Sequence, residues 1–293
     1  MKELAILIVA HRDADMINRL ISRLQHPEID IYLHIDKKSQ YLTSEIEQYP
    51  NLTILPSKDS FDVHWGQNQD NRAAFALINL SAGKYNHYAL ISGQHYLLKP
   101  AESIVETLKR SQSKDFIVTM PQDSPCYKDF LGRSLLYWPE FLIGRSPLQK
   151  AAGFIYRNAN KAFNYPVRRK KTGSPASPFM FGSQWWVLSG KTINRIQKLI
   201  MNNATILNYF DNCFCPDECI FQTLVSECPD SDVVNDNLTY IDWSEGNAST
   251  KLLACDDFDL LANSNCLFAR KFDSTASKEL LDYIDLNLLL VKP

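Results

Sequence analysis

The sequence lacks any apolar run long enough to cross a bilayer. Its longest run is Leu4–Ala10, and the run Leu288–Val291 is shorter still, whereas a membrane-spanning helix needs about 20 apolar residues. It also lacks an export signal, because Lys2 and Glu3 lead directly into the first short apolar run. We therefore expect a cytoplasmic protein rather than a membrane-spanning or secreted one.

An excess of charge of one sign is also missing. The chain of 293 residues has 31 basic and 33 acidic residues, which gives a formal net charge of -2. A protein that binds nucleic acid through bulk charge is strongly basic, so no nucleic-acid partner is expected. The length and the 45% hydrophobic content favour a single globular domain of the α/β class.

The sequence also lacks the short motifs that identify several common active sites. The sequence has no phosphate-binding glycine loop, no nucleophile elbow and no zinc-protease helix motif. Cys213, Cys215 and Cys219 cluster, but without paired Cys-x-x-Cys spacing or a nearby histidine. In a chain with seven cysteines and no export signal, we interpret them as reduced thiols. No metal is therefore expected.

Strand-like and helix-like segments alternate in the first third of the chain. The patterns predict strands at Leu4–Ala10, Asp30–Asp36, Asn51–Pro56, His87–Ser92 and Asp115–Met120, and helices at Asp13–Gln25, Asp70–Leu80 and Ala101–Arg110. This alternation is typical of a parallel sheet covered on both faces. Since such sheets bind ligands at the carboxyl ends of their strands, the segments 10–12, 34–38 and 92–95 become the candidate site.

The remainder is less regular. The patterns predict helices at Ser146–Asn164, Thr192–Met201, Pro216–Ser226 and Ser277–Leu290, and strands at Gln184–Leu188 and Leu238–Asp242. Residues 165–178 contain three prolines and the run Arg168–Lys171. We interpret this segment as a flexible basic loop over a substrate site, although it could mark a domain boundary or be merely solvated.

Two neighbouring acids are candidates for acid–base chemistry. Pro216 is a plausible first helical residue, which places Asp217 and Glu218 in the first turn. The helix dipole would keep either carboxylate ionised, as a general base requires. An ordinary capping role is the alternative. Asp36 and His11 each follow a predicted strand, and each could bind a nucleotide or serve only the local turn.

Aromatic and basic residues suggest a sugar and a phosphate. Trp185, Trp186 and Trp243 could stack on sugar rings, although one of two adjacent strand residues normally points into the core. Arg270 and Lys271 follow a short apolar stretch. A tethered pair of cations of this kind is suited to clamp a diphosphate.

These pieces resemble the core-2/I-branching β-1,6-N-acetylglucosaminyltransferase family, glycosyltransferase family 14, in a short bacterial form. The resemblance covers most of the chain. It is carried by the order and spacing of Ile8–His11, His34–Lys38, Trp65–Gly66, Leu90–Gln94, Gly182–Trp186, Pro216–Glu218 and Leu267–Asp273.

The resemblance implies a GT-A type (Rossmann-like) fold with a mixed, mainly parallel sheet flanked by helices. It also implies inverting, metal-independent transfer from a UDP-sugar, with Glu218 as the general base. The donor-side residues would be Ala10, His11, Asp36, Lys251, Arg270 and Lys271, and the acceptor-side residues would be Gln94, Trp185, Trp186 and Trp243. Residues 1–121 would form the nucleotide-binding half, and residues 122–293 the acceptor and catalytic half.

The sequence departs from the family pattern at His95 and Leu97, where many relatives have Asp and Pro. The loss of that carboxylate leaves the donor sugar open. We expect transfer of GlcNAc from UDP-GlcNAc to a glycan or lipid-linked glycan in bacterial surface polysaccharide synthesis, with possible peripheral contact at the inner membrane face. The alternatives are a xylosyltransferase or other UDP-sugar transferase, and a degenerate sugar-nucleotide-binding protein without activity.

Overall fold

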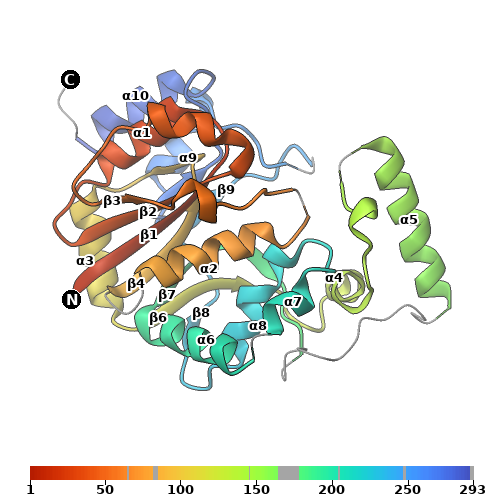
Figure 1. The fold of residues 1–293 in the computed structure, drawn as a ribbon. Coiled ribbons are helices and arrows are strands. Elements are labelled where there is room, and N and C mark those ends of the chain that lie inside the picture. Colours follow the sequence, from red (N-terminus) through yellow and green to blue (C-terminus); the bar gives the residue numbers. More distant parts are fainter. Residues whose placement is uncertain are drawn as a thin grey trace.

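A computed structural model describes residues 1–64, 66–81, 85–144, 146–163, 178–203, 205–246 and 249–290. Its main sheet has seven strands in the order β3-β2-β1-β4-β7-β6-β8 (Figure 1). These strands are β1 (Lys2–Ala10), β2 (Ile29–Ile35), β3 (Leu52–Ile54), β4 (Tyr85–Ser92), β6 (Lys114–Thr119), β7 (Gly182–Ser189) and β8 (Asp232–Val234). Only β7 runs antiparallel to its neighbours β4 and β6. The expected α/β class with a mixed, mainly parallel sheet is confirmed.

Strand β1 shows why the sheet is buried on both faces. Its residues Leu4, Ile6 and Ile8 belong to one apolar cluster, and Ala5 and Leu7 to another on the opposite face. All five side chains are inaccessible to solvent. A continuous apolar run is what a parallel strand covered by helices on both sides requires.

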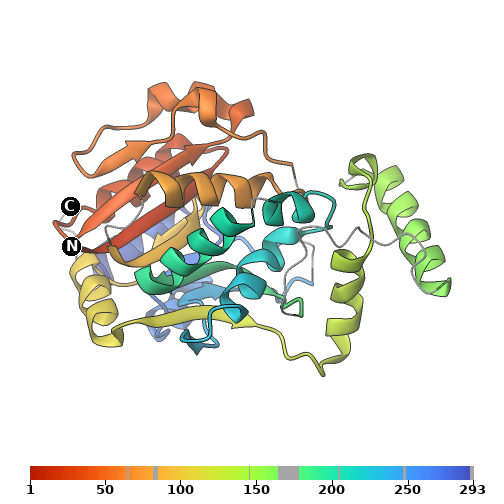
Figure 2. The same ribbon diagram turned by 60° about the horizontal axis from the view of Figure 1, so that its bottom comes forward.

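Helices form the two covering layers (Figures 1 and 2). One layer includes α1 (Ala14–Arg23), α3 (Ala101–Ser111), α9 (Phe258–Ala262) and α10 (Lys278–Asn287), and the other includes α2 (Gln69–Ser81), α6 (Gly190–Asn202), α7 (Ile206–Phe210) and α8 (Ile220–Ser226). Two further helices, α4 (Pro125–Leu135) and α5 (Pro147–Ala162), extend from the end of the sheet. Among the helices so described, none has both the length and the apolar character needed to cross a bilayer.

A second sheet joins the end of the chain to its first half. It consists of β5 (His95–Leu97), β10 (Phe268–Arg270) and β9 (Thr239–Ile241), with β10 in the centre. The register pairs Arg270 with His95. The carboxylate of Asp285 on α10 accepts hydrogen bonds from Arg19 (2.8 Å), Arg23 (2.6 Å) and the hydroxyl of Tyr96 (2.5 Å). The C-terminal segment therefore packs directly on the N-terminal part of the chain.

The sequence patterns located most elements but misjudged two regions. The helix predicted over Pro216–Ser226 is confirmed only at Ile220–Ser226, because a short 3-10 turn at Pro216–Glu218 is separated from α8 by the non-helical Cys219. The terminal helix is shorter than the predicted Ser277–Leu290. The patterns also missed the helices α4, α7 and α9 and the short strands β5, β8 and β10. The basic loop prediction falls on residues that lie outside the described ones, Pro178 excepted.

Candidate active site

A cavity of about 480 Å³ opens at the carboxyl ends of β1, β2 and β4. Its lining includes Ala10, His11, Arg12, His34, Asp36, Lys38, Asp70, Ser92, Gln94, Gln184, Trp185, Ser249, Arg270 and Lys271. The three segments that the parallel-strand rule selected do meet here. Seven of the predicted site residues line the cavity, namely Ala10, His11, Asp36, Gln94, Trp185, Arg270 and Lys271.

Trp185 and Arg270 form one wall of this cavity. The Arg270 guanidinium lies over the Trp185 ring, 4.7 Å from its centroid, which is a cation–π arrangement. The His95 ring meets the same indole edge-on at 4.7 Å. Burial lowers the pKa of Arg270 to about 10, so the side chain is still charged at neutral pH. Its buried Nε has no hydrogen-bond partner among the described residues, and this unmet donor suits an anionic ligand.

His95, which replaces an expected carboxylate, is packed away from solvent rather than presented to a ligand. Its ring is fully buried, and Nδ1 accepts a hydrogen bond from the Ser92 amide at 3.0 Å. Burial, followed by the charge of Arg270, holds its pKa well below the ordinary value for histidine. His95 is therefore neutral, and its ring packs against Trp185.

Cations surround the mouth of the cavity. The ammonium of Lys271 lies 3.4 Å from the Ser249 hydroxyl, and Arg12 forms a partly exposed ion pair with Asp273 at 3.2 Å. Burial and the neighbouring charge of Arg12 lower the pKa of His11. The His11 ring is therefore predominantly neutral at pH 7.

Two carboxyls balance these cations. The side chain of Asp36 is 3% exposed and accepts a hydrogen bond from the Lys38 amide at 2.9 Å. Burial, then the charge of Asp36, raises the pKa of Asp70 to about 7. Asp70, which also contacts Gln184, was missed by sequence reasoning because an acid in a first helical turn reads as a cap.

Glu218 sits beside the cavity in the Pro216–Glu218 turn. Cys215 starts this turn with a left-handed backbone (φ 52°). Glu218 Oε2 accepts a hydrogen bond from Arg133 Nη1 at 2.5 Å. Burial raises the pKa of Glu218, while the guanidinium of Arg133 acts against that rise. Arg133 is a second residue that the sequence did not reveal, because 85 positions separate the partners.

Asp217 interacts electrostatically with Glu218 and with Asp70, which lines the cavity. Its pKa is raised to about 8 by burial, then by the charges of Glu218 and Asp70. Its Oδ1 is buried, and no described residue gives it a hydrogen bond. The expectation that either acid stays ionised through a helix dipole is wrong for Asp217, because a short buried turn replaces the helix. Arg133, not a dipole, favours the ionised form of Glu218.

The other four predicted site residues belong to the described part of the chain but do not line this cavity. They are Glu218, Lys251, Trp186 and Trp243. Trp186 is 1% exposed and packs against Phe221 on the opposite face of the sheet, so its position contradicts an acceptor contact. The Lys251 ammonium forms an ion pair with Asp257 at 2.6 Å. The positive charge that was predicted to bind the donor is therefore already paired within the protein. Trp243 is 58% exposed and follows β9.

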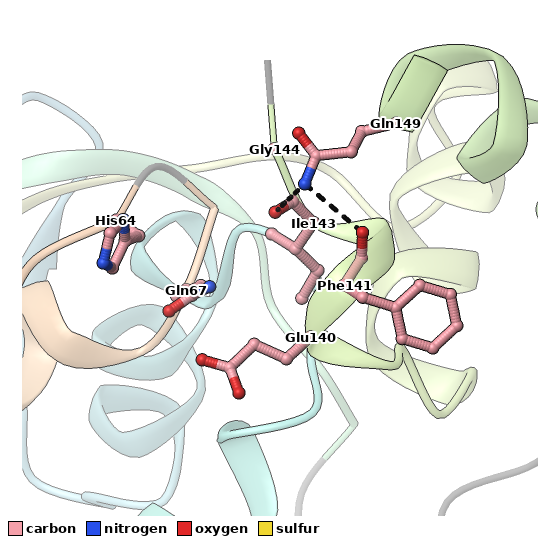
Figure 3. Close-up of a pocket in the computed structure, with 7 residues that line it drawn as sticks. All are labelled: His64, Gln67, Glu140, Phe141, Ile143, Gly144 and Gln149. Carbon is pink, nitrogen blue, oxygen red and sulfur yellow. Dashed lines mark hydrogen bonds between the residues drawn. The ribbon is translucent and has the colours of Figure 1, made fainter. Parts of the chain in front are cut away.

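A second cavity of about 610 Å³ is lined by His64, Gln67 and residues of the segment 140–149. Figure 3 shows Glu140 and Gln67 extending towards it, with the Gln149 amide held by the Phe141 and Ile143 carbonyls. Gly66 joins this cavity to the turn, because its carbonyl accepts from the Cys215 amide at 3.0 Å. Gly66 has φ +80°, and an added Cβ would lie 3.0 Å from Ile143, so this close approach favours glycine.

The cysteine cluster is structural in this setting. Cys213 and Cys219 are buried, and their sulfur atoms lie 3.5 and 3.4 Å from the Ser134 hydroxyl. Within the described ranges, no group of three or more His, Cys, Asp or Glu side chains is placed to hold a metal ion. Metal-independent chemistry stays a prediction.

Comparison with known proteins gives the chain its family. Xylosyltransferase 2 of Canis lupus familiaris is 22% identical over 97% of this chain, and the xylosyltransferase of Ciona intestinalis is 20% identical over 97%. The chain spans about a third of the length of these relatives. A solved 4-diphosphocytidyl-2C-methyl-D-erythritol synthase from Anaerococcus prevotii is 12% identical, with a TM-score of 0.34 over 72% of this chain and 85% of that one.

The family described as Core-2/I-Branching enzyme matches residues 4–133 and 148–259. These two ranges cover most of the chain, and they contain the strand ends of the cavity together with Glu218. The expected resemblance is thereby confirmed, and the chain belongs to the Core-2/I-Branching enzyme family, glycosyltransferase family 14.

Proposed function

We propose that this protein transfers GlcNAc from UDP-GlcNAc to a glycan hydroxyl with inversion and without a metal ion. The observation that carries the proposal is the arrangement of one cavity with Arg270 and Lys271 in its wall and the Pro216–Glu218 turn beside it. The two cations suit the negative charge that develops on a departing UDP. Asp36 and His11, which follow the carboxyl ends of the adjacent strands β2 and β1, suit the uridine.

The proposed chemistry needs one base on the acceptor side. Glu218 would take the proton from the acceptor hydroxyl as its oxygen attacks the anomeric carbon, and the bond to the UDP oxygen breaks in the same step. Arg133 favours the ionised carboxylate that this role requires. The cavity lined by Glu140 and Gln67 lies beside the turn, and we assign it to the acceptor, a glycan or lipid-linked glycan.

A xylosyl donor is the second candidate. The named relatives are xylosyltransferases, and His95 removes the carboxylate that would contact the sugar in many family members. The assignment of GlcNAc rather than xylose rests on the family resemblance.

A donor screen tests the proposal. Purified protein is mixed with UDP, UDP-GlcNAc, UDP-xylose, a GDP-sugar and a dTDP-sugar, each with EDTA or manganese, and thermal shift and UDP release are recorded. We expect stabilisation by UDP and UDP-GlcNAc that survives EDTA. Selective release of UDP from UDP-xylose would make xylose, and not GlcNAc, the transferred sugar. A requirement for manganese would overturn the metal-independent mechanism. No response to any UDP compound would indicate a degenerate protein without activity.

The base is tested by paired substitutions in the same turn. Glu218→Gln should abolish UDP release while leaving the UDP-induced thermal shift intact. Asp217→Asn is the matched control, because Asp217 is already largely protonated at neutral pH and should retain most of the activity. The reverse pattern would transfer the role of base to Asp217.

A further inference from the structure

Helix α5 presents an apolar face to solvent. Leu148, Phe154 and Ile155 are 79%, 61% and 67% exposed. Ala151 and Ala162 are exposed as well, and their spacing from Leu148 and Ile155 places them on the same side of the helix. Figure 2 shows that α5 stands apart from the sheet and its covering helices.

The fold does not need this face, because the opposite side of α5 holds the helix in place. Gly153 and Asn160 are the buried positions. The Tyr156 ring lies 5.5 Å from the Trp138 ring, and the Tyr156 hydroxyl donates to the Tyr137 carbonyl. Exposure of the apolar residues is thus a property of a fixed helix and not of a detached one.

The charges of α5 indicate what this face binds. Lys150, Arg157 and Lys161 are its charged residues, and Pro147–Ala162 contains no acid, although acids outnumber bases in the chain as a whole. Their spacings of seven and four residues align them along one edge of the helix, next to Phe154. An apolar face bordered by cations without acids is complementary to an anionic lipid surface.

We propose that α5 docks this protein on the surface of an anionic phospholipid bilayer. The helix would lie in the plane of the interface, with Leu148 and Ile155 among the upper acyl chains and the cations at the headgroups. Phe141 and Phe163, which are 73% and 76% exposed, lie near the two ends of α5. The proposal is independent of the donor and of the base, so it stands or falls separately from the proposed function.

Co-sedimentation of the full chain with vesicles tests it. One set of vesicles contains phosphatidylcholine alone, and the other contains phosphatidylcholine and phosphatidylglycerol in equal parts. We expect binding to the anionic vesicles only. Leu148→Glu with Ile155→Glu should weaken it at least about tenfold, and replacement of Lys150, Arg157 and Lys161 by Gln should weaken it about 100-fold.

Matched controls separate this face from exposure or charge in general. Met201→Glu alters an apolar residue of α6 that is 82% exposed, and Lys109, Arg110 and Lys114 are three exposed cations elsewhere that can be replaced by Gln together. Neither control should change vesicle binding. Equal binding by control and α5 variants would overturn the proposal.

Two other results would also overturn it. A lower melting temperature of the Leu148→Glu, Ile155→Glu variant, with no vesicle binding by the unmodified protein, would mean that the chain itself covers the face. A concentration-dependent dimer that this variant abolishes, again without vesicle binding, would mean that a second copy covers it.

Discussion

Replacing Arg133 by Gln should move the pH dependence of turnover without changing its maximum. The Arg133 guanidinium donates to Glu218 Oε2 at 2.5 Å and also lies over the Phe130 ring, 3.9 Å from the centroid. Two unit charges about 4 Å apart interact by about 4 kcal/mol at an effective dielectric constant of about 20. The side chains are 25% and 35% exposed, so solvent screening reduces this to roughly 1.4 kcal/mol.

The sign follows from the role proposed for Glu218. A general base must be ionised to act, and burial already raises the pKa of Glu218. Loss of Arg133 removes the group that opposes the rise, so the acidic limb of the pH–rate profile should move up by about one pH unit. Activity well below that limb should fall about tenfold, and activity above it should be retained.

UDP release from the donor, followed across pH, measures the effect. Arg72→Gln is the matched control, because it removes an ion pair with Asp211 at 2.7 Å away from the base; it should lower stability without moving the limb. An unchanged profile in the Arg133 variant would refute the reasoning. A loss that is equal at every pH would assign Arg133 to the binding of substrate instead.

Three further predictions concern Asp285, the two adjacent tryptophans and the two lysines assigned to the donor. Asp285→Asn should destabilise the fold by about 3 kcal/mol in urea unfolding at pH 7, because two arginines lose a buried partner. Burial acts to raise the pKa of Asp285, but Arg23, Tyr96 and Arg19 lower it overall, so the deficit should be complete above the ordinary carboxyl pKa and disappear as the pH falls through the lowered value. Trp186→Ala should cost about 3–5 kcal/mol of stability, whereas Trp185→Ala should chiefly weaken UDP binding, as measured by calorimetry. Lys271→Met should weaken UDP binding about tenfold or more, whereas Lys251→Met should leave it nearly unchanged, and equal losses would show that the Asp257 pair opens to bind the donor.

Local pattern was enough for much of the fold. The apolar run at Leu4–Ala10 predicted a strand buried on both faces, because only a central parallel strand is covered twice. The strand ends then brought Ala10, Asp36 and Gln94 into one cavity, since parallel strands deliver their carboxyl ends to a common edge. The family could also be predicted from local pattern, because each of its motifs is a short contiguous segment.

Prediction was least reliable where neighbours in space are far apart in sequence. Pro216–Ser226 looked like one helix, but the left-handed Cys215 and the non-helical Cys219 break it so that the turn packs under the cavity. Trp185 and Trp186 are adjacent in sequence, and the alternation of a strand separates them onto opposite faces. The pattern predicted that one of the two would be buried, but both are, at 5% and 1% exposed, and the packed sheet leaves only Trp185 in the lining of the cavity.

The sequence by itself determined the order of strands and helices, the family and the set of polar residues at the strand ends, because these depend on contiguous residues and their periodicity. The tertiary structure decided the electrostatic state of the site. Arg133 reaches Glu218 across 85 positions, and burial together with nearby acids raises the pKa of Asp217 to about 8. It also left the apolar face of α5 in solvent, since exposure depends on which surfaces the rest of the chain covers.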